Sequence, residues 1–349
     1  MTNSGTATSE KDHSNLSALL KPKLLILELW QLGDLVIGTP FYRAAVERFD
    51  VTLLAKPFAL DVRRRLWPEV RVVPFIAPWT AFKNKYQLWR WPLPQIIRLR
   101  RELTAEHFDV GLSARWDPRD HFLLNLFGAK KRIGFPRVRS GIFLTDPIMR
   151  PRPEAHRYES WRVIGRALDM ELPPREQIQI PPAGPGRKNI LIHTGAGQQV
   201  RVWPLDFYKK LAGHLRSKDF RVQIACDADQ RDWWLRGGER TVATPSTVAE
   251  LIELTDRAAA LIGNDSGPGH LAAFCGVPTF TIFGPQLPEW FAPLHPQAEW
   301  ISGKACPYLP CSDYCRFSEP FCIRKISEEE VLERVEKFLA ALAQNPESS

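Results

Sequence analysis

The 349-residue sequence has no apolar run that approaches the roughly 18 residues of a membrane-spanning helix. The stretch from Met1 to Leu20 is polar and rich in serine and threonine, without the basic start and apolar centre of a secretory signal. These absences argue against an integral membrane or secreted protein. We therefore expect a disordered tail over residues 1–22 and a protein that stays in the cytoplasm, where it is made.

Closely spaced cysteine pairs are also absent, because no two of the six cysteines are separated by only two residues. Cys226 and Cys275 each stand alone in apolar surroundings and are expected in the core. The remaining four are Cys306, Cys311, Cys315 and Cys322. Their spacings are looser than those of the common zinc modules. A structural metal site and a packed cluster of free thiols fit this spacing equally well, and disulfides fit it less well.

Acidic residues are fewer than basic ones. The chain has 39 Asp and Glu against 47 Lys and Arg, which gives a net charge of +8. The excess lies mainly in the first half, in groups such as Arg63–Arg65, Lys130–Arg132 and the trio Arg98, Arg100 and Arg101. Such groups are either solvated surface or a face that attracts a phosphorylated acceptor, an acidic membrane or nucleic acid. No nucleic-acid-binding module is present and the basic residues are scattered, so we expect no nucleic-acid partner.

Both halves of the chain alternate short β-branched or leucine-rich runs with longer amphipathic segments, which is typical of parallel α/β architecture. Each half opens with a strand (24–29 and 189–193), a glycine-containing loop and a helix (39–49 and 205–216). The proline- and glycine-rich stretch 180–186 cannot continue a helix or a central strand and is the best interdomain linker. We expect two doubly wound domains over residues 23–182 and 183–326, facing each other across a cleft, and a C-terminal helix and tail over 327–349.

The loop from His193 to Pro204 connects a strand to a helix and contains Gly195 and Gly197. Small residues let backbone N–H groups approach an oxyanion, and the helix N-terminus adds partial positive charge. Arg201 lies just before the helix, in a position to clamp a phosphate with two nitrogens. Val200 replaces the third glycine of a dinucleotide fingerprint, so this is neither that motif nor a P-loop. The alternative is a turn that only connects two elements.

A second loop, Gly263 to Ala273, also follows an apolar strand and opens a helix. Asp265 at the strand end is suited to accept hydrogen bonds from sugar hydroxyls. Ser266 and the backbone from Gly267 onward are suited to cup a diphosphate, with His270 inside the first helical turn. A third segment, Trp30 to Pro40, places Asp34 after the first strand, where it would face the cleft. Catalysis and helix capping explain Asp34 equally well on this pattern alone.

Together the three segments resemble glycosyltransferase family 9, the ADP-heptose:lipopolysaccharide heptosyltransferases. The matching motifs are Gly33-Asp34 with Thr39-Pro40, His193 to Pro204, Asp265-Ser266-Gly267 with His270, and Pro278 to Pro285. The resemblance implies a GT-B fold of two Rossmann-like domains, with the acceptor in the first domain and the donor in the second. It also implies an inverting transfer without a metal or cofactor, from a nucleotide sugar that is ADP-heptose by default, to a lipopolysaccharide core or related glycolipid.

The resemblance also assigns roles to positions. Asp34 matches the general base that takes the proton of the acceptor hydroxyl. The segment matching the donor-phosphate loop comprises Thr194, Gly195, Ala196, Gly197, Gln198 and Arg201. The segment matching the nucleotide-sugar turn comprises Asp265, Ser266, Gly267 and His270.

Two departures from the family pattern matter. Arg201 stands where lysine is usual, which keeps the charge but changes the donor geometry. The cysteine cluster is no part of the pattern. We expect Arg98, Arg100 and Arg101 to contact an anionic glycolipid at the inner-membrane surface. The alternatives are another GT-B enzyme with a different nucleotide sugar, including an epimerase, and a non-catalytic nucleic-acid-binding protein.

Overall fold

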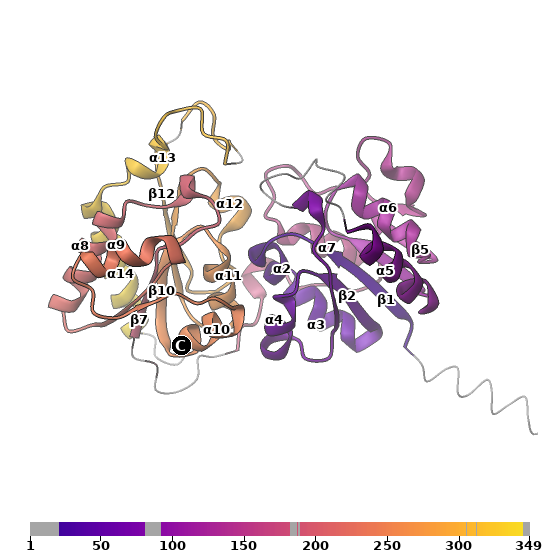
Figure 1. Ribbon diagram of the computed structural model, residues 1–349, viewed down its shortest axis with the longest axis horizontal. Helices are drawn as coiled ribbons and strands as arrows, with labels where there is room; N and C mark the ends of the chain where they lie inside the picture. Colours follow the sequence, from indigo (N-terminus) through magenta and orange to yellow (C-terminus); the bar gives the residue numbers. More distant parts are fainter. Residues whose placement is uncertain are drawn as a thin grey trace, which may run out of the picture.

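The computed structural model describes residues 21–80, 92–181, 187, 189–304, 306–311 and 313–344. Two α/β domains lie side by side, each built on a six-stranded sheet (Figure 1). This confirms the predicted pair of doubly wound domains. Residues 182–186, most of the predicted linker, lie outside the described residues.

The first sheet is parallel and has the strand order β3-β2-β1-β4-β5-β6. Its strands are β1 (Lys23–Glu28), β2 (Asp50–Ala55), β3 (Arg71–Pro74), β4 (Val110–Ser113), β5 (Lys131–Gly134) and β6 (Asp146–Pro147). The helices of this half are α2 (Leu32–Ile37), α3 (Thr39–Arg48), α4 (Ala59–Leu66), α5 (Leu93–Ala105), α6 (Pro118–Leu126) and α7 (Tyr158–Arg166). Helices cover both faces of the sheet, which is why the central strand β1 is an almost unbroken apolar run.

The second sheet, β12-β11-β10-β7-β8-β9, repeats this order. Its strands are β7 (Asn189–His193), β8 (Arg221–Ala225), β9 (Val242–Ala243), β10 (Ala258–Asn264), β11 (Thr279–Phe283) and β12 (Glu299–Ser302). The helices are α8 (Leu205–Ser217), α9 (Arg231–Arg236), α10 (Val248–Asp256), α11 (Gly267–Phe274), α12 (Pro288–Phe291), α13 (Phe321–Arg324) and α14 (Glu328–Gln344). Among the described helices, none is long and apolar enough to cross a membrane.

The strand order fixes where loops can gather. In each sheet the direction in which successive strands are added reverses between two neighbouring parallel strands, β1 and β4 in the first domain and β7 and β10 in the second. Ligands of doubly wound sheets bind beyond the carboxyl ends of the strands at such a switch point. The loops after β1, β4, β7 and β10 are therefore the ones to examine.

The domains meet where α2 approaches α11, with α4 opposite α10 (Figure 1). Glycines make the approach close: a Cβ on Gly267 would lie 2.9 Å from Cβ of Leu32, and one on Gly33 would lie 2.8 Å from Cδ2 of His270. Apolar side chains of the second domain, including Leu251 and Phe274, join the core cluster of the first. The two cores are thus continuous across the seam.

The structure corrects one local prediction. The segment through Gly33 and Asp34 was expected to be a loop, but residues Leu32–Ile37 form α2, with Asp34 in its first turn. The final helix α14 packs on α8 and β12 of the second domain. A capping box begins this helix, because Glu330 N donates to Ser327 Oγ and Ser327 N donates to the Glu330 carboxylate, both at 3.2 Å.

Candidate active site

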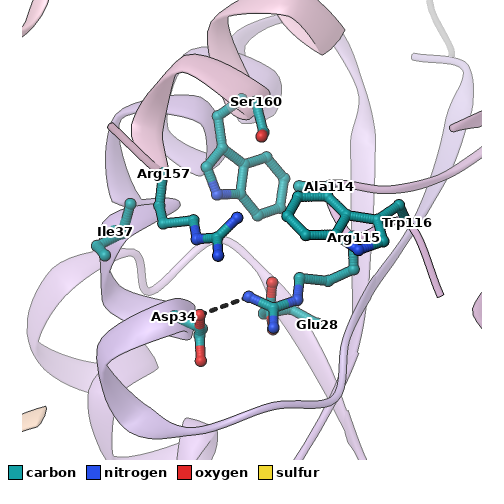
Figure 2. A pocket seen from close by; sticks show the side chains of 9 residues that line it. Glu28, Asp34, Ile37, Ala114, Arg115, Trp116, Arg157 and Ser160 are labelled. Atoms are coloured by element: carbon teal, nitrogen blue, oxygen red, sulfur yellow. Dashed lines mark hydrogen bonds and ion pairs between the residues drawn. The ribbon is translucent and has the colours of Figure 1, made fainter. Parts of the chain in front are cut away.

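Asp34 and Arg115 form an ion pair at the switch point of the first sheet. Arg115 follows β4, and its Nη1 donates to Oδ1 of Asp34 at 2.6 Å (Figure 2). The guanidinium also stacks on Trp30, 4.5 Å from the ring centroid. Burial alone would lower the pKa of Arg115, but the carboxylates of Asp34 and Glu28 outweigh it and raise the pKa. The arginine therefore stays charged and holds Asp34 in one orientation.

A second carboxyl group, Glu28, lies beneath this pair at the end of β1. Only 2% of Glu28 is exposed, and burial raises its pKa to about 8, with Asp34 adding to the rise and Arg115 opposing it. Glu28 therefore carries a proton at neutral pH, while Arg115 remains the cation that faces Asp34. The sequence analysis did not identify Glu28 or Arg115. Pairing the predicted strands in the doubly wound order would have placed both beside Asp34.

These residues line a pocket that opens next to Asp34 (Figure 2). Its polar lining comes from Glu28, Asp34, Arg115, Arg157 and Ser160. Its apolar lining comes from Ile37, Ala114, Trp116 and Trp161. A carboxylate at the mouth of an aromatic and cationic pocket is suited to deprotonate a hydroxyl group held there.

The loop after β7 is anchored from within. Thr194 is fully buried: its Oγ1 donates to Gln230 Oε1 at 2.7 Å and accepts from Trp234 Nε1 at 3.3 Å. A Cβ on Gly195 would collide with the carboxylate of Asp227, which accepts from Ala196 N at 3.0 Å. These contacts hold the loop beside the neighbouring strand β8. Gly197 is exposed and Gln198 half-buried.

Arg201 lies at the end of this loop and is engaged by two carboxylates. Its Nε and Nη2 donate to the two oxygens of Asp313 at 2.8 and 2.7 Å, and its Nη1 donates to Asp265 Oδ2 at 3.1 Å. Burial would lower the pKa of Arg201, but the hydrogen bond to Asp313 and the negative charges of Asp265 and Asp313 outweigh burial and raise it. The guanidinium thus already holds oxyanions in a fork geometry, the arrangement that a phosphate would share.

The turn after β10 begins α11. Asp265 is 2% exposed, and burial raises its pKa to about 6 although Arg201 opposes the rise. His270 is also buried, and burial lowers its pKa to about 4, so the ring is neutral at pH 7. Ser266 precedes the first helical residue, Gly267, and its Oγ donates to the carbonyl of Asn264 at 3.2 Å.

The first-domain carboxylate and the second-domain loops belong to one site. The negative charge of Asp34 raises the pKa of Arg201, Asp265 and His270, and so favours the protonated form of all three. His270 packs against Gly33, the residue before Asp34. A donor held at the start of α11 would therefore face Asp34 across the seam.

The sequence profile of glycosyltransferase family 9 (heptosyltransferase) matches residues 96–320, more than half of the chain. This chain belongs to glycosyltransferase family 9. Lipopolysaccharide heptosyltransferase 1 of Pseudomonas aeruginosa is 24% identical over 290 residues, covering 72% of this chain and 81% of that protein.

Solved structures agree with this family on the fold. The E. coli heptosyltransferase WaaC with ADP superposes with a TM-score of 0.72 at 15% identity, covering 90% of this chain and 99% of WaaC. The family 9 glycosyltransferase from Veillonella parvula gives 0.74 at 19% identity, covering 93% and 98% of the two chains. The GT-B architecture that the resemblance implied is confirmed, and the protein is a glycosyltransferase.

Two other groups of predicted residues of this family 9 enzyme lie outside the pocket. Arg98, Arg100 and Arg101 are exposed on α5, and none of them lines the pocket around Asp34. The four clustered cysteines are free thiols, with Cys322 buried and the others half-buried. Within the described ranges, no group of three or more His, Cys, Asp or Glu side chains is arranged to hold a metal ion. The cluster nevertheless reaches the site, because Asp313 lies between Cys311 and Cys315.

Proposed function

We propose that this enzyme transfers a heptose from ADP-heptose to a lipopolysaccharide core or related glycolipid, with inversion at the sugar carbon. The observation that carries the proposal is the meeting of Asp34 with the start of α11, where Gly33 packs against His270. This contact supports a general base in the first domain that faces a donor-phosphate site in the second. ADP-heptose is the proposed donor because curated relatives are heptosyltransferases and WaaC was solved with ADP.

In this proposal Asp34 accepts the proton of the acceptor hydroxyl as that oxygen attacks the anomeric carbon. Arg115 holds Oδ1 of Asp34 at 2.6 Å, which directs the other oxygen to the substrate. The departing diphosphate gains negative charge, which Arg201 and the N-terminus of α11 stabilise from fixed positions. Besides the acceptor, the proposed reaction requires no molecule other than the nucleotide-sugar donor.

Calorimetry without added metal tests the donor assignment, with ADP, ADP-heptose and a UDP-sugar as ligands. We expect the protein to prefer the ADP ligands, Arg201→Ala to lose them, and Asp34→Ala to keep them. A preference for the UDP-sugar would retain a nucleotide-sugar enzyme but discard heptose. Binding of none of the three would contradict the proposed function altogether.

We further propose that the enzyme works at the cytoplasmic face of the inner membrane, with α5 against an anionic lipid surface. On α5, Leu93 and Ile97 are 57% and 56% exposed beside Arg98, Arg100 and Arg101. Exposed apolar side chains flanked by arginines are typical of interfacial helices. Replacing the three arginines by glutamine should weaken sedimentation with anionic vesicles and leave ADP affinity unchanged. Equal sedimentation of both proteins would contradict this placement.

A further inference from the structure

Arg157 lies at the seam between the domains, immediately before α7. Its backbone N–H donates to the carbonyl of Trp290 at 3.1 Å, which ties it to the second domain. The preceding His156 makes a parallel contact: Nδ1 accepts from Tyr158 N at 3.1 Å, so Nε2 carries the proton and donates to the carbonyl of Ala292 at 3.0 Å. The backbone at Arg157 is therefore held by both domains.

The side chain of Arg157 enters the pocket from this anchored position. Its guanidinium carbon lies 4.8 Å from the ring centroid of Trp116 in the first domain. It also lies 5.6 and 5.3 Å from the rings of Trp290 and Phe291 in the second. Figure 2 shows the guanidinium extending toward Asp34 and Arg115. Aromatic rings of both domains thus aim this cation at the proposed reaction centre.

The guanidinium of Arg157 forms no hydrogen bond or ion pair with an anion among the described residues. Its buried Nε has no acceptor in that part of the chain. Burial and the nearby Arg115 lower the pKa of Arg157 to about 10 although the charge of Asp34 opposes them, whereas the pKa of Arg115, which is hydrogen-bonded to Asp34, is raised. A half-buried charge without a hydrogen-bonded partner is costly unless a ligand supplies one.

The charged side chains that line the pocket include one more cation than anion. Arg115 and Asp34 neutralise each other at 2.6 Å, and Glu28 is protonated at neutral pH. Arg157 is then the unbalanced charge. Arg150 is exposed and does not line the pocket, but its guanidinium carbon lies 4.7 Å from the ring of Trp116 that Arg157 also contacts, so it adds positive charge nearby. The pocket therefore carries a positive charge immediately beside the carboxylate proposed as base.

We propose that Arg157 binds an oxyanion of the acceptor, a carboxylate or a phosphate that lies next to the hydroxyl group deprotonated by Asp34. The planar guanidinium matches either group with two parallel hydrogen bonds. The proposal rests on the proposed function in taking this pocket as the acceptor site. It makes Arg157 the residue that selects acidic acceptors over neutral ones by adding binding energy at this pocket.

A binding experiment tests the subsite without requiring turnover. Inorganic phosphate and, separately, acetate are titrated calorimetrically into the full-length protein before and after saturation with ADP. Arg157→Gln, Arg157→Lys and the wild type are compared. The matched control is Arg166→Gln, an exposed arginine at the other end of α7. Thermal midpoints of all four proteins report whether each variant is folded.

We expect the ADP-saturated wild type and Arg166→Gln to bind one of the two anions saturably. Arg157→Gln should bind it at least about tenfold more weakly, as loss of a charge-assisted pair predicts, and Arg157→Lys should fall between them. Equal anion affinity in the wild type and Arg157→Gln would overturn the proposal. A loss of ADP affinity in Arg157→Gln would also overturn it, because the residue would then serve the donor. If ADP binds none of the four proteins, the proposed function fails, while the anion titrations still report on Arg157.

Acceptor kinetics then distinguish the two sources of the anion. Native, phosphatase-treated and carboxyl-reduced core oligosaccharides are compared as acceptors. Arg157→Gln should raise KM for the native acceptor about tenfold with little change in kcat. The KM of the wild type should rise by about the same factor with the acceptor that lacks the recognised group. An unchanged KM in Arg157→Gln would show that the anion site does not serve the acceptor.

Discussion

At the scale of single residues, Asp34 and Asp313 differ in how many of their carboxylate oxygens an arginine occupies. Arg115 contacts one oxygen of Asp34, whereas Arg201 contacts both oxygens of Asp313. Asp34 therefore keeps an oxygen for a substrate proton. Asp313 instead occupies the guanidinium that a donor phosphate would use, so the two anions should compete.

Asp313→Asn should remove this competition. Asp313 has a left-handed backbone with φ 70°, which asparagine tolerates. The amide oxygen of asparagine can still accept a hydrogen bond from Arg201, but it carries no negative charge. We expect ADP to bind about threefold to tenfold more tightly, measured by calorimetry. Asp219→Asn is the control, because Asp219 has a similar φ of 63° and is exposed. Weaker ADP binding in Asp313→Asn would show that the carboxylate supports the donor site instead of competing with it.

Glu28→Gln should change how stability depends on pH. The pKa of Glu28 is about 8 in the folded protein and near 4.5 when unfolded, so the folded state holds the proton more tightly. The resulting stabilisation is complete below pH 4.5 and is lost as pH rises to 8. Glutamine avoids this loss. We therefore expect the free energy of unfolding of Glu28→Gln, measured in urea, to increase relative to that of the wild type as the pH rises. The difference should grow by up to about 1.4 kcal/mol per pH unit between pH 5 and 8. A difference that stays constant across this range, as expected for the exposed control Glu69→Gln, would contradict the assignment.

The sequence predicted part of the site at this scale. Asp34 and the segments around Arg201 and Asp265 could be located because each follows an apolar strand in a short motif. Arg115 required the pairing of the predicted strands as well, and Arg157 and Asp313 could not be located, because each reaches the site from a segment distant in the chain. Their roles depend on which strands pair and where the domains touch, and neither follows from local spacing.

At the scale of elements, the contact of α2 with α11 brings the two halves of the site together. The approach depends on glycine, because a Cβ on Gly267 would lie 2.9 Å from Cβ of Leu32. Strand positions followed from apolar runs, but α2 was mistaken for a loop. It has only six residues and no side-chain cap, so its helical form depends on packing at the seam instead of a local signal.

Gly267→Ala should separate the two helices. Gly267 begins α11, and the added methyl group would collide with Leu32 of α2. Such overpacking costs about 1–3 kcal/mol. We expect a lower thermal midpoint and slower transfer. Gly213→Ala is the control, since its Cβ would meet nothing within 4 Å and alanine in α8 should stabilise the helix by about 0.5–1 kcal/mol. Equal midpoints for the two variants would contradict the proposed close packing.

At the scale of the whole molecule, the domains share one apolar cluster. Phe274, 1% exposed in the second domain, packs in the core of the first. Because this cluster crosses the seam, we expect the wild type to unfold in a single calorimetric transition, although two-domain proteins often show two. Phe274→Ala should split the transition, whereas Phe338→Ala, which removes a ring from the second core alone, should lower the midpoint without a split. Two transitions in the wild type would contradict a shared core.

The two-domain architecture was predictable from the alternation of strands and helices and from the repeated opening of each half. The orientation of the domains was not, because it depends on glycine contacts and shared apolar side chains that leave no periodic pattern. The cysteine cluster shows the same limit. Its spacing left metal and thiols open, and the structure adds that these cysteines form no disulfide and that Asp313, among them in the chain, pairs with Arg201.

The most direct test of the account is the rate of heptose transfer by Asp34→Asn, with ADP affinity measured on the same preparation. Asparagine keeps the size of the side chain but cannot accept the proton of the acceptor hydroxyl. The account predicts a rate about 10²–10⁴-fold below that of the wild type, with ADP binding unchanged. A variant that transfers heptose within a few-fold of the wild-type rate would show that another group is the base.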